Sequence, residues 1–232
     1  MKYVLLWLEG PLQSWGYDSR FGRRESLNFP TKSGVLGIIL AAMGAGGEQR
    51  ELLSQLSQYR QTVLSYVRLS GSKPVQLRDF HMVGSGYDTS DKWQNLLVPK
   101  TEDGKSSVGG GSKITHRAYI QDGAFAVVIE AEEHLAPQVA SAVQDPVWDI
   151  SLGRKSCPPS DIVSRGVFDS FDSACQAAED IASQKNRRKD FIVYDEVLED
   201  GEQLTLSDVP LQFGVQKIYG DRTVTIVAEQ SE

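Results

Sequence analysis

The stretch FPTKSGVLGIILAAMG, Phe29 to Gly44, places two hydroxyl residues and a lysine directly before an apolar run. Pro30 followed by the hydroxyl groups of Thr31 and Ser33 is typical of a helix start, so a helix should begin near one of these hydroxyl residues. The apolar residues that follow predict that most of this helix lies in the core. A glycine-rich segment should end it.

The N-terminus of this helix is also a candidate anion site. Its unpaired N–H groups and partial positive potential favour anions, and Thr31, Lys32 and Ser33 add two hydroxyls and a cation. An ordinary hydroxyl cap beside a solvated lysine is the alternative. The loop before the helix carries Trp15, Arg23 and Arg24, residue types that grip single-stranded RNA. They favour a phosphate seat built from residues 31–34, including Gly34.

Around this helix, the hydrophobic pattern predicts an ordered series of elements. YVLLWL at residues 3–8 is typical of a buried strand that ends in a turn at Gly10-Pro11. A helix is expected within residues 48–59, strands within 62–71 and 74–84, and a helix at 135–143. The last strand of this series comes from residues 148–152 or from further on. The order is close to the split β-α-β arrangement of ferredoxin-like α+β domains.

Two further clusters of basic and aromatic residues stand out. The polar insertion at about residues 84–112 is long enough to be the tip of a hairpin with arms at 78–83 and 114–120. These arms carry Arg78, His81, His116, Arg117 and Tyr119. Because strand residues alternate between faces, at most about half of them can face one ligand.

The third cluster is SLGRKSCPPS, residues 151–160, where Arg154 and Lys155 follow a glycine that permits close backbone approach. A solvated basic turn is the alternative interpretation. The pattern therefore predicts a domain at 1–150 with an insertion at about 78–120. A C-terminal β-rich region follows at 151–232, with one helix near 170–184.

The charge of the chain is unevenly distributed. The net charge of −7 argues against a nucleic-acid binder when taken alone. Up to Val127, however, the sequence has 15 Lys and Arg and 11 Asp and Glu, whereas the remainder has 9 Lys and Arg and 20 Asp and Glu. Cationic residues are therefore concentrated in the first half, and the acidic remainder faces solvent or a basic partner. Surface solubility alone is the competing explanation.

Several function classes receive no support from the sequence. Two cysteines are too few for a disulfide scaffold, which indicates a reducing, cytoplasmic location, and the N-terminal apolar run is too short for a membrane span. Three scattered histidines give no metal-ligand spacing. GGGSK at residues 109–113 lacks the order of a phosphate-binding P-loop. The sequence therefore predicts neither a metal nor a cofactor.

Four segments in matching order resemble one family: GPLQSWG at 10–16, FPTKSGVLGIILAAMG at 29–44, LRDFH at 77–81 and SLGRKSCPPS at 151–160. They are similar to the fifth CRISPR-associated protein family, the CasD-type subunits of type I-E Cascade complexes. The resemblance extends from Tyr3 to about Pro159. It departs from the family at DGKSSVGGGSK, residues 103–113, where the tip of the hairpin is glycine-rich.

The resemblance implies a ferredoxin-like, RNA-recognition-type core with a long β-hairpin thumb. Subunits of this kind hold the 5′ handle of the CRISPR RNA, cap the filament of backbone subunits and contact the large PAM-recognising subunit. Target DNA is then reached mainly through the complex. By similarity, residues 10–16 and 31–34 lie near the handle, and residues 78–83 and 114–120 form the arms of the thumb.

An enzymatic alternative comes from related subunits of another subtype, which cleave precursor RNA. Metal-independent cleavage of CRISPR repeat RNA needs groups that deprotonate the 2′-OH and stabilise the leaving oxygen, and Lys113, His116 and Tyr119 are of suitable types. In the subtype that the chain resembles, a different subunit performs this cleavage. We therefore expect a noncatalytic RNA-binding subunit. A protein-only interaction module that uses the acidic C-terminal third is a third alternative.

Overall fold

A computed structural model describes residues 1–17, 19, 22–70, 75–83, 90–93, 100–105 and 113–229. Most of the tip of the predicted hairpin, namely residues 84–89, 94–99 and 106–112, lies outside the described residues. No helix in the described part of the chain is both long and apolar enough to cross a membrane.

The centre of the molecule is an antiparallel sheet covered by helices. Strands β1 (Lys2–Gln13), β5 (Gln61–Arg68), β7 (Lys113–Ala131) and β8 (Ser164–Phe168) lie in the order β5-β7-β1-β8. Each neighbouring pair is antiparallel. Helices α1 (Lys32–Ala42) and α2 (Arg50–Ser57) connect β1 to β5, and α4 (Leu135–Gln144) connects β7 to β8. The strand after α4 therefore comes from beyond residues 148–152.

The C-terminal residues extend this same sheet. After α5 (Phe171–Gln184), strands β9 (Arg187–Tyr194), β10 (Glu202–Gln212) and β11 (Ile218–Ala228) follow in the sheet order β10-β11-β9-β5. The region 151–232 thus supplies β8, β9, β10 and β11 to the same sheet as β1, β5 and β7. Because β9 pairs with β5, Val193 of β9 belongs to the same hydrophobic cluster as the residues of α1 and α4.

The prediction that Gly10-Pro11 ends the first strand is wrong. β1 continues to Gln13, and Leu12 still pairs with Gln121 of β7. Proline is tolerated where a strand lacks a neighbour that needs its N–H. The pairing of β1 with β8 stops at Leu6, so Pro11 lies in a part of β1 that pairs with β7 alone.

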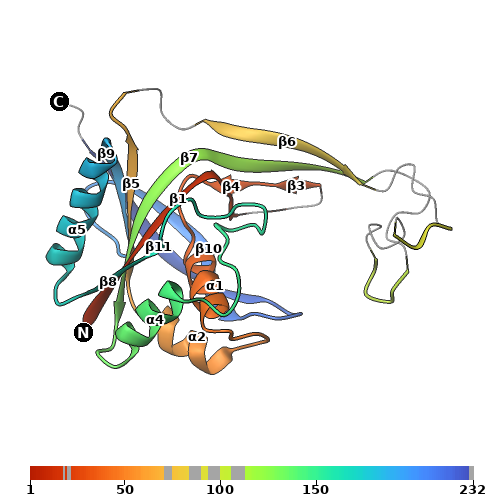
Figure 1. The fold of residues 1–232 in the computed structure, drawn as a ribbon, viewed down its shortest axis with the longest axis horizontal. Coiled ribbons are helices and arrows are strands. Elements are labelled where there is room, and N and C mark those ends of the chain that lie inside the picture. The colour runs from red at the N-terminus through yellow and green to blue at the C-terminus, as the bar shows by residue number, and fades with distance from the viewer. Residues whose placement is uncertain are drawn as a thin grey trace.

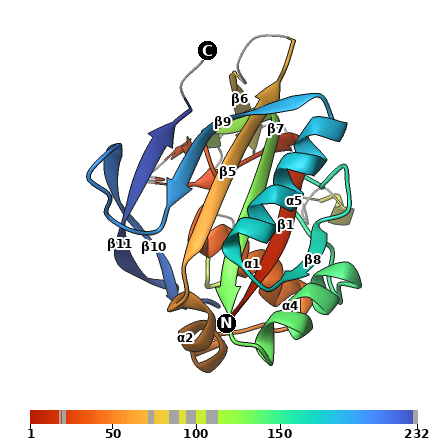
Figure 2. The same ribbon diagram turned by 90° about the vertical axis from the view of Figure 1, so that its left-hand side faces the viewer.

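Helices cover the two faces of the sheet differently. In Figures 1 and 2, α5 lies on one face, and α1, α2 and α4 lie on the other. The face under α5 is packed by Ala174, Ala178 and Ala182, which recur every fourth residue and lie against Trp7 and Leu64. Small side chains at this spacing let the helix backbone approach the sheet closely.

The distal part of β7 leaves the body of the molecule. There it pairs with β6 (Gln76–Val83) in antiparallel register, from Gln76 opposite Ile120 to Val83 opposite Lys113. Figure 1 shows this two-stranded ribbon projecting from the sheet. The short strand β3 (Arg23–Arg24) joins it in parallel, and β2 (Trp15–Gly16) pairs separately with β4 (Ser26–Leu27). The pairing predicted for the two arms is therefore present.

Replacing Ala178 by leucine should lower the free energy of unfolding by about 1–3 kcal/mol, because no space remains between α5 and the sheet. Chemical denaturation followed by circular dichroism measures the change. Ser183→Leu on the exposed face of the same helix is the matched control and should change stability little. Equal losses in the two variants would contradict close packing under α5.

Candidate nucleic-acid interface

The anion at the N-terminus of α1 is a carboxylate side chain of the protein itself. The backbone N–H of Lys32 donates a hydrogen bond of 2.7 Å to the carboxylate of Asp208 on β10. Asp208 is 4% exposed and also accepts two hydrogen bonds from the guanidinium of Arg222 on β11. The acidic C-terminal region thus supplies the negative charge that this helix end favours.

The side chain of Lys32 is also enclosed. It is 5% exposed, and its Nζ lies 2.8 Å from the carboxylate of Asp195 and 2.8 Å from the carbonyl oxygen of Tyr59. Arg222 completes the network with an ion pair to Asp195 of 3.1 Å. Burial alone would raise the pKa of Asp195, but the adjacent Arg222 and Lys32 cations hold it below its usual value. The prediction of a phosphate site at residues 31–34 is therefore wrong, because the Lys32 side chain is buried and already paired.

The neighbours of Lys32 have structural roles as well. The Thr31 hydroxyl accepts a hydrogen bond from the Gly34 N–H and caps α1, and the Ser33 hydroxyl donates to Thr31. Gly34 packs against the indole of Trp15, where a Cβ would lie 2.8 Å from the ring. Trp15 is fully buried, and its Nε1 donates to the side chain of Gln13. Trp15 therefore offers no surface for stacking RNA bases in this structure.

Replacing Lys32 by alanine should lower the free energy of unfolding by about 3–5 kcal/mol, because buried carboxylates lose one of their two cations. Urea denaturation measures this loss, with Lys217→Ala at an exposed site as the control. RNA affinity per folded molecule should stay unchanged. Unaltered stability combined with weakened RNA binding would show instead that Lys32 contacts RNA.

Three of the predicted residues meet on one face of the ribbon formed by β6 and residues 113–120 of β7. His116 on β7 lies opposite Arg23 of β3, and Arg78 of β6 lies opposite Ala118. Directly paired strand residues point to the same side. Arg23, Arg78 and His116 are all exposed. A hollow of about 150 Å³, called the basic hollow below, opens here and is lined by Arg23, Glu25, Arg78, His116, Arg117 and Ala118.

The alternate strand positions send other predicted residues to the opposite face. On that face Arg24 of β3 pairs with Arg117 of β7, and Tyr119 lies two residues further along β7. His81 of β6 lies on the same face, opposite Thr115. Tyr119 is only 6% exposed. The two faces therefore separate the exposed residues Arg23, Arg78 and His116 from Arg24, His81, Arg117 and Tyr119, which are partly exposed or buried; Arg117 still reaches the lining of the basic hollow.

Arg154 ties the loop of residues 151–160 to this second face. Its guanidinium lies 5.1 Å from the centre of the Tyr119 ring and donates hydrogen bonds to the Ser14 hydroxyl and the Arg24 carbonyl. Gly153 has a φ of 88°, and a Cβ there would lie 1.8 Å from the Ser14 carbonyl oxygen, so only glycine permits this approach. Lys155 is exposed.

Phe80, which the sequence places with Arg78 and His81 on the same hairpin arm, also belongs to the open face of the ribbon. It lies opposite His116, the two rings are 5.5 Å apart in an edge-to-face arrangement, and Phe80 is 59% exposed. Arg78, Phe80 and Met82 alternate along β6 and therefore share one face of the strand. Within the described residues, no group of three or more His, Cys, Asp and Glu is arranged to hold a metal ion.

Comparisons with known proteins agree on one family. The family model described as "CRISPR-associated protein (Cas_Cas5)" matches residues 3–225. The chain is 30% identical over 167 residues to the CRISPR system Cascade subunit CasD of Escherichia coli strain K12. This alignment covers 68% of this chain and 67% of that protein.

Solved structures agree with this match. A chain of a structure described as a CRISPR RNA-guided surveillance complex aligns with 97% of this chain and 89% of its own length, at a TM-score of 0.69 and 26% identity. A structure described as a Cas protein has the same fold, with a TM-score of 0.62 and 22% identity over 97% of this chain and 94% of its own. The sequence and the fold together therefore show that this chain belongs to the CRISPR-associated Cas5 family.

Proposed function

We propose that this protein is a noncatalytic RNA-binding subunit of a type I-E CRISPR Cascade complex and that it holds the 5′ handle of the CRISPR RNA. The observation that carries the proposal is the basic hollow, where Arg23 of β3 and Arg78 of β6 lie beside His116 of β7. Guanidinium groups at this density match the phosphates of a nucleic-acid backbone.

The topology supports an RNA-recognition type of domain. Two strand-helix units with the strand order β5-β7-β1-β8 correspond to the split β-α-β arrangement of ferredoxin-like folds. The ribbon of β6 and β7 then acts as the thumb. Its open face combines Arg78 and His116 with the exposed ring of Phe80, a combination suited to single-stranded RNA.

The proposed partners follow from the relatives. One relative is a subunit of Cascade, and another belongs to an RNA-guided surveillance complex. We propose that this chain caps a filament of backbone subunits, contacts the large PAM-recognising subunit and meets target DNA mainly through the assembled complex in the cytoplasm. The exposed, basic ribbon supports contact with RNA. The outer surface of the acidic C-terminal third faces a protein partner or solvent.

Replacing Arg23 or Arg78 by alanine should weaken binding of repeat-derived handle RNA, because each substitution removes a guanidinium group that contacts a phosphate in the proposed complex. Each substitution should also lower the slope of log affinity against log salt concentration by about 0.7. Filter binding or fluorescence anisotropy across a salt series measures both effects.

Arg50→Ala, at an exposed position on α2 away from the ribbon, is the matched control and should leave the slope unchanged. Binding that is independent of salt in the unsubstituted protein, or equal slopes for all three variants, would refute the phosphate contacts. In that case the hollow is not the RNA interface.

A noncatalytic role is supported by the positions of the candidate catalytic residues. His116 and Tyr119 are three residues apart on β7, so their side chains leave opposite faces of the strand. Tyr119 is buried under Arg154. A general base and a partner that stabilises the leaving oxygen need to reach the same phosphodiester, which this arrangement does not favour.

Purified protein incubated with CRISPR repeat RNA in EDTA should therefore leave the RNA intact, as judged on a denaturing gel. His116→Ala should weaken RNA binding without altering the gel pattern. Specific fragments that form with the unsubstituted protein and vanish with His116→Ala would instead establish a metal-independent endoribonuclease.

A further inference from the structure

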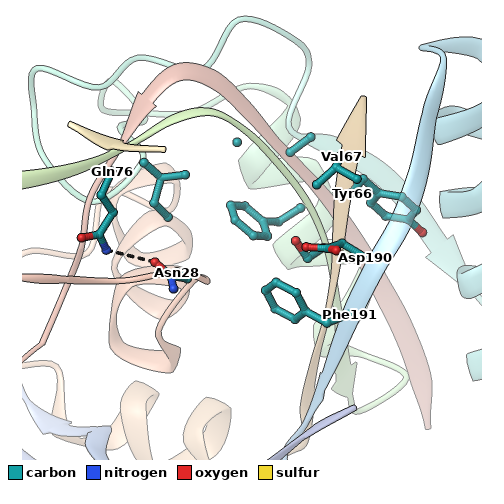
Figure 3. A pocket seen from close by; sticks show the side chains of 11 residues that line it. Asn28, Tyr66, Val67, Gln76, Asp190 and Phe191 are labelled. Atoms are coloured by element: carbon teal, nitrogen blue, oxygen red, sulfur yellow. Dashed lines mark hydrogen bonds between the residues drawn. The ribbon is translucent and has the colours of Figure 1, made fainter. Parts of the chain in front are cut away.

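A second hollow lies at the root of the ribbon. It has a volume of about 290 Å³, just below the range of roughly 300–1,000 Å³ that is typical of small-molecule sites. Figure 3 shows side chains from β5, β6, β7, β9 and the segment before α1 converging on it. We call it the root pocket; it is lined by Asn28, Ser65, Tyr66, Val67, Gln76, Ile120, Gly123, Ala124, Phe125, Asp190 and Phe191.

The pocket results from a mismatch of side-chain size across three strands. Phe191 of β9 pairs with Ser65 of β5, and Ser65 pairs with Phe125 of β7. Paired residues share a face, so a small serine separates two phenyl rings and leaves space between them. Asp122 has a φ of 51° within β7, which interrupts the alternation and allows Ile120 and Phe125 to line the same pocket.

Polar groups stand at the rim and the wall of the pocket. The side-chain amide of Gln76 donates hydrogen bonds to the Ser26 carbonyl and to the Asn28 side chain, which fixes both amides at the entrance. Figure 3 shows this bond on one side of the pocket and Asp190 on the other. The pocket therefore combines two aromatic rings, two amides and a carboxylate.

The root pocket continues the open face of the ribbon. Gln76 of the pocket and Arg78 of the basic hollow are two residues apart on β6, and their partners Ile120 and Ala118 are two apart on β7. Residues two apart in a strand lie on one face and are separated by about 6.6 Å. The basic hollow and the entrance of the root pocket therefore lie within one nucleotide step of each other along β6.

We propose that the root pocket takes one unstacked base of the bound RNA, an inference that rests on the proposed function. The Phe125 and Phe191 rings supply an apolar, aromatic lining for the base, and the amides and Asp190 supply acceptors for the amino or imino donors of its edge. A phosphate is disfavoured, because none of the residues that line the pocket is a lysine or an arginine and the rings offer it no donors. The pocket therefore selects a base and leaves the backbone at the arginines outside.

The test uses handle RNAs in which each nucleotide in turn is replaced by an abasic site. With the unsubstituted protein, one position should weaken binding by about 5- to 150-fold, the effect of a lost base–aromatic contact. Ser65→Leu fills the space between the two rings and should weaken binding of intact RNA by a similar factor. The same variant should bind the RNA that is abasic at that position no worse than the unsubstituted protein does.

Two further measurements cover the case in which Ser65→Leu does not fold. Gln76→Ala changes only the rim of the pocket. It should weaken binding of intact RNA but not binding of the RNA that is abasic at the selected position. Gln55→Ala, at an exposed position on α2, is its control. A 2-aminopurine base at the selected position, bound to the unsubstituted protein, should be shielded from acrylamide quenching.

The outcomes separate the two proposals. If RNA binding depends on salt and on Arg78 but no single base is coupled to Ser65 or Gln76, the pocket proposal is overturned and the proposed function stands. If the protein does not bind the handle RNA at all, both fall. A single coupled and shielded position establishes the base site.

Discussion

The continuity of strand β7 is the constraint on which the rest of the structure depends. Its 19 residues run without interruption from Lys113 to Ala131. The second half lies between β1 and β5 in the central sheet, and the first half pairs with β6 and β3 outside it. The ribbon is therefore an extension of the core sheet, and the position of Arg78 and His116 is set by the same hydrogen-bond register that sets the core.

The buried ion pairs fix the N-terminus of α1 inside the protein and leave the net charge of the surface unchanged, because two carboxylates are buried with two cations. Asp195 and Asp208, both from the acidic C-terminal region, are turned inward against Lys32 and Arg222. These carboxylates do not contribute to the outer surface. The Asp208 carboxylate also occupies the N-terminus of α1, so the strongest anion site that the sequence suggests is filled from within, and the proposed phosphate contacts lie on the ribbon instead.

The two faces of the ribbon give its basic residues different tasks. On one face, Arg154 stacks on Tyr119 and bonds to the Arg24 carbonyl, which anchors the root of the ribbon to the loop after α4. On the other face, Arg78 and His116 remain exposed beside the basic hollow and the root pocket. One strand thus joins structural support to the proposed binding surface by the alternation of its side chains.

The sequence by itself determined the local structure and the family. The hydroxyl cap at Thr31, the apolar periodicity of α1 and the alternation of the strands depend on neighbouring residues, and so they appear in the sequence pattern. The four ordered motifs identified the family for the same reason. The candidate interface was located only in part: Arg78 and His116 were predicted on facing arms, whereas Arg23, predicted beside the start of α1, joins them only in the structure. Lys32 and Trp15 were assigned to a surface from which they are absent.

Only the tertiary structure decided which charges are open to a ligand. Asp208 lies 176 positions from Lys32 in the chain, and no local pattern reveals that its carboxylate caps α1. The root pocket likewise depends on the pairing of Ser65 with two phenylalanines from distant strands. Long-range pairing brings together residues that the sequence separates, and burial then determines whether a cation holds the protein together or remains available to RNA.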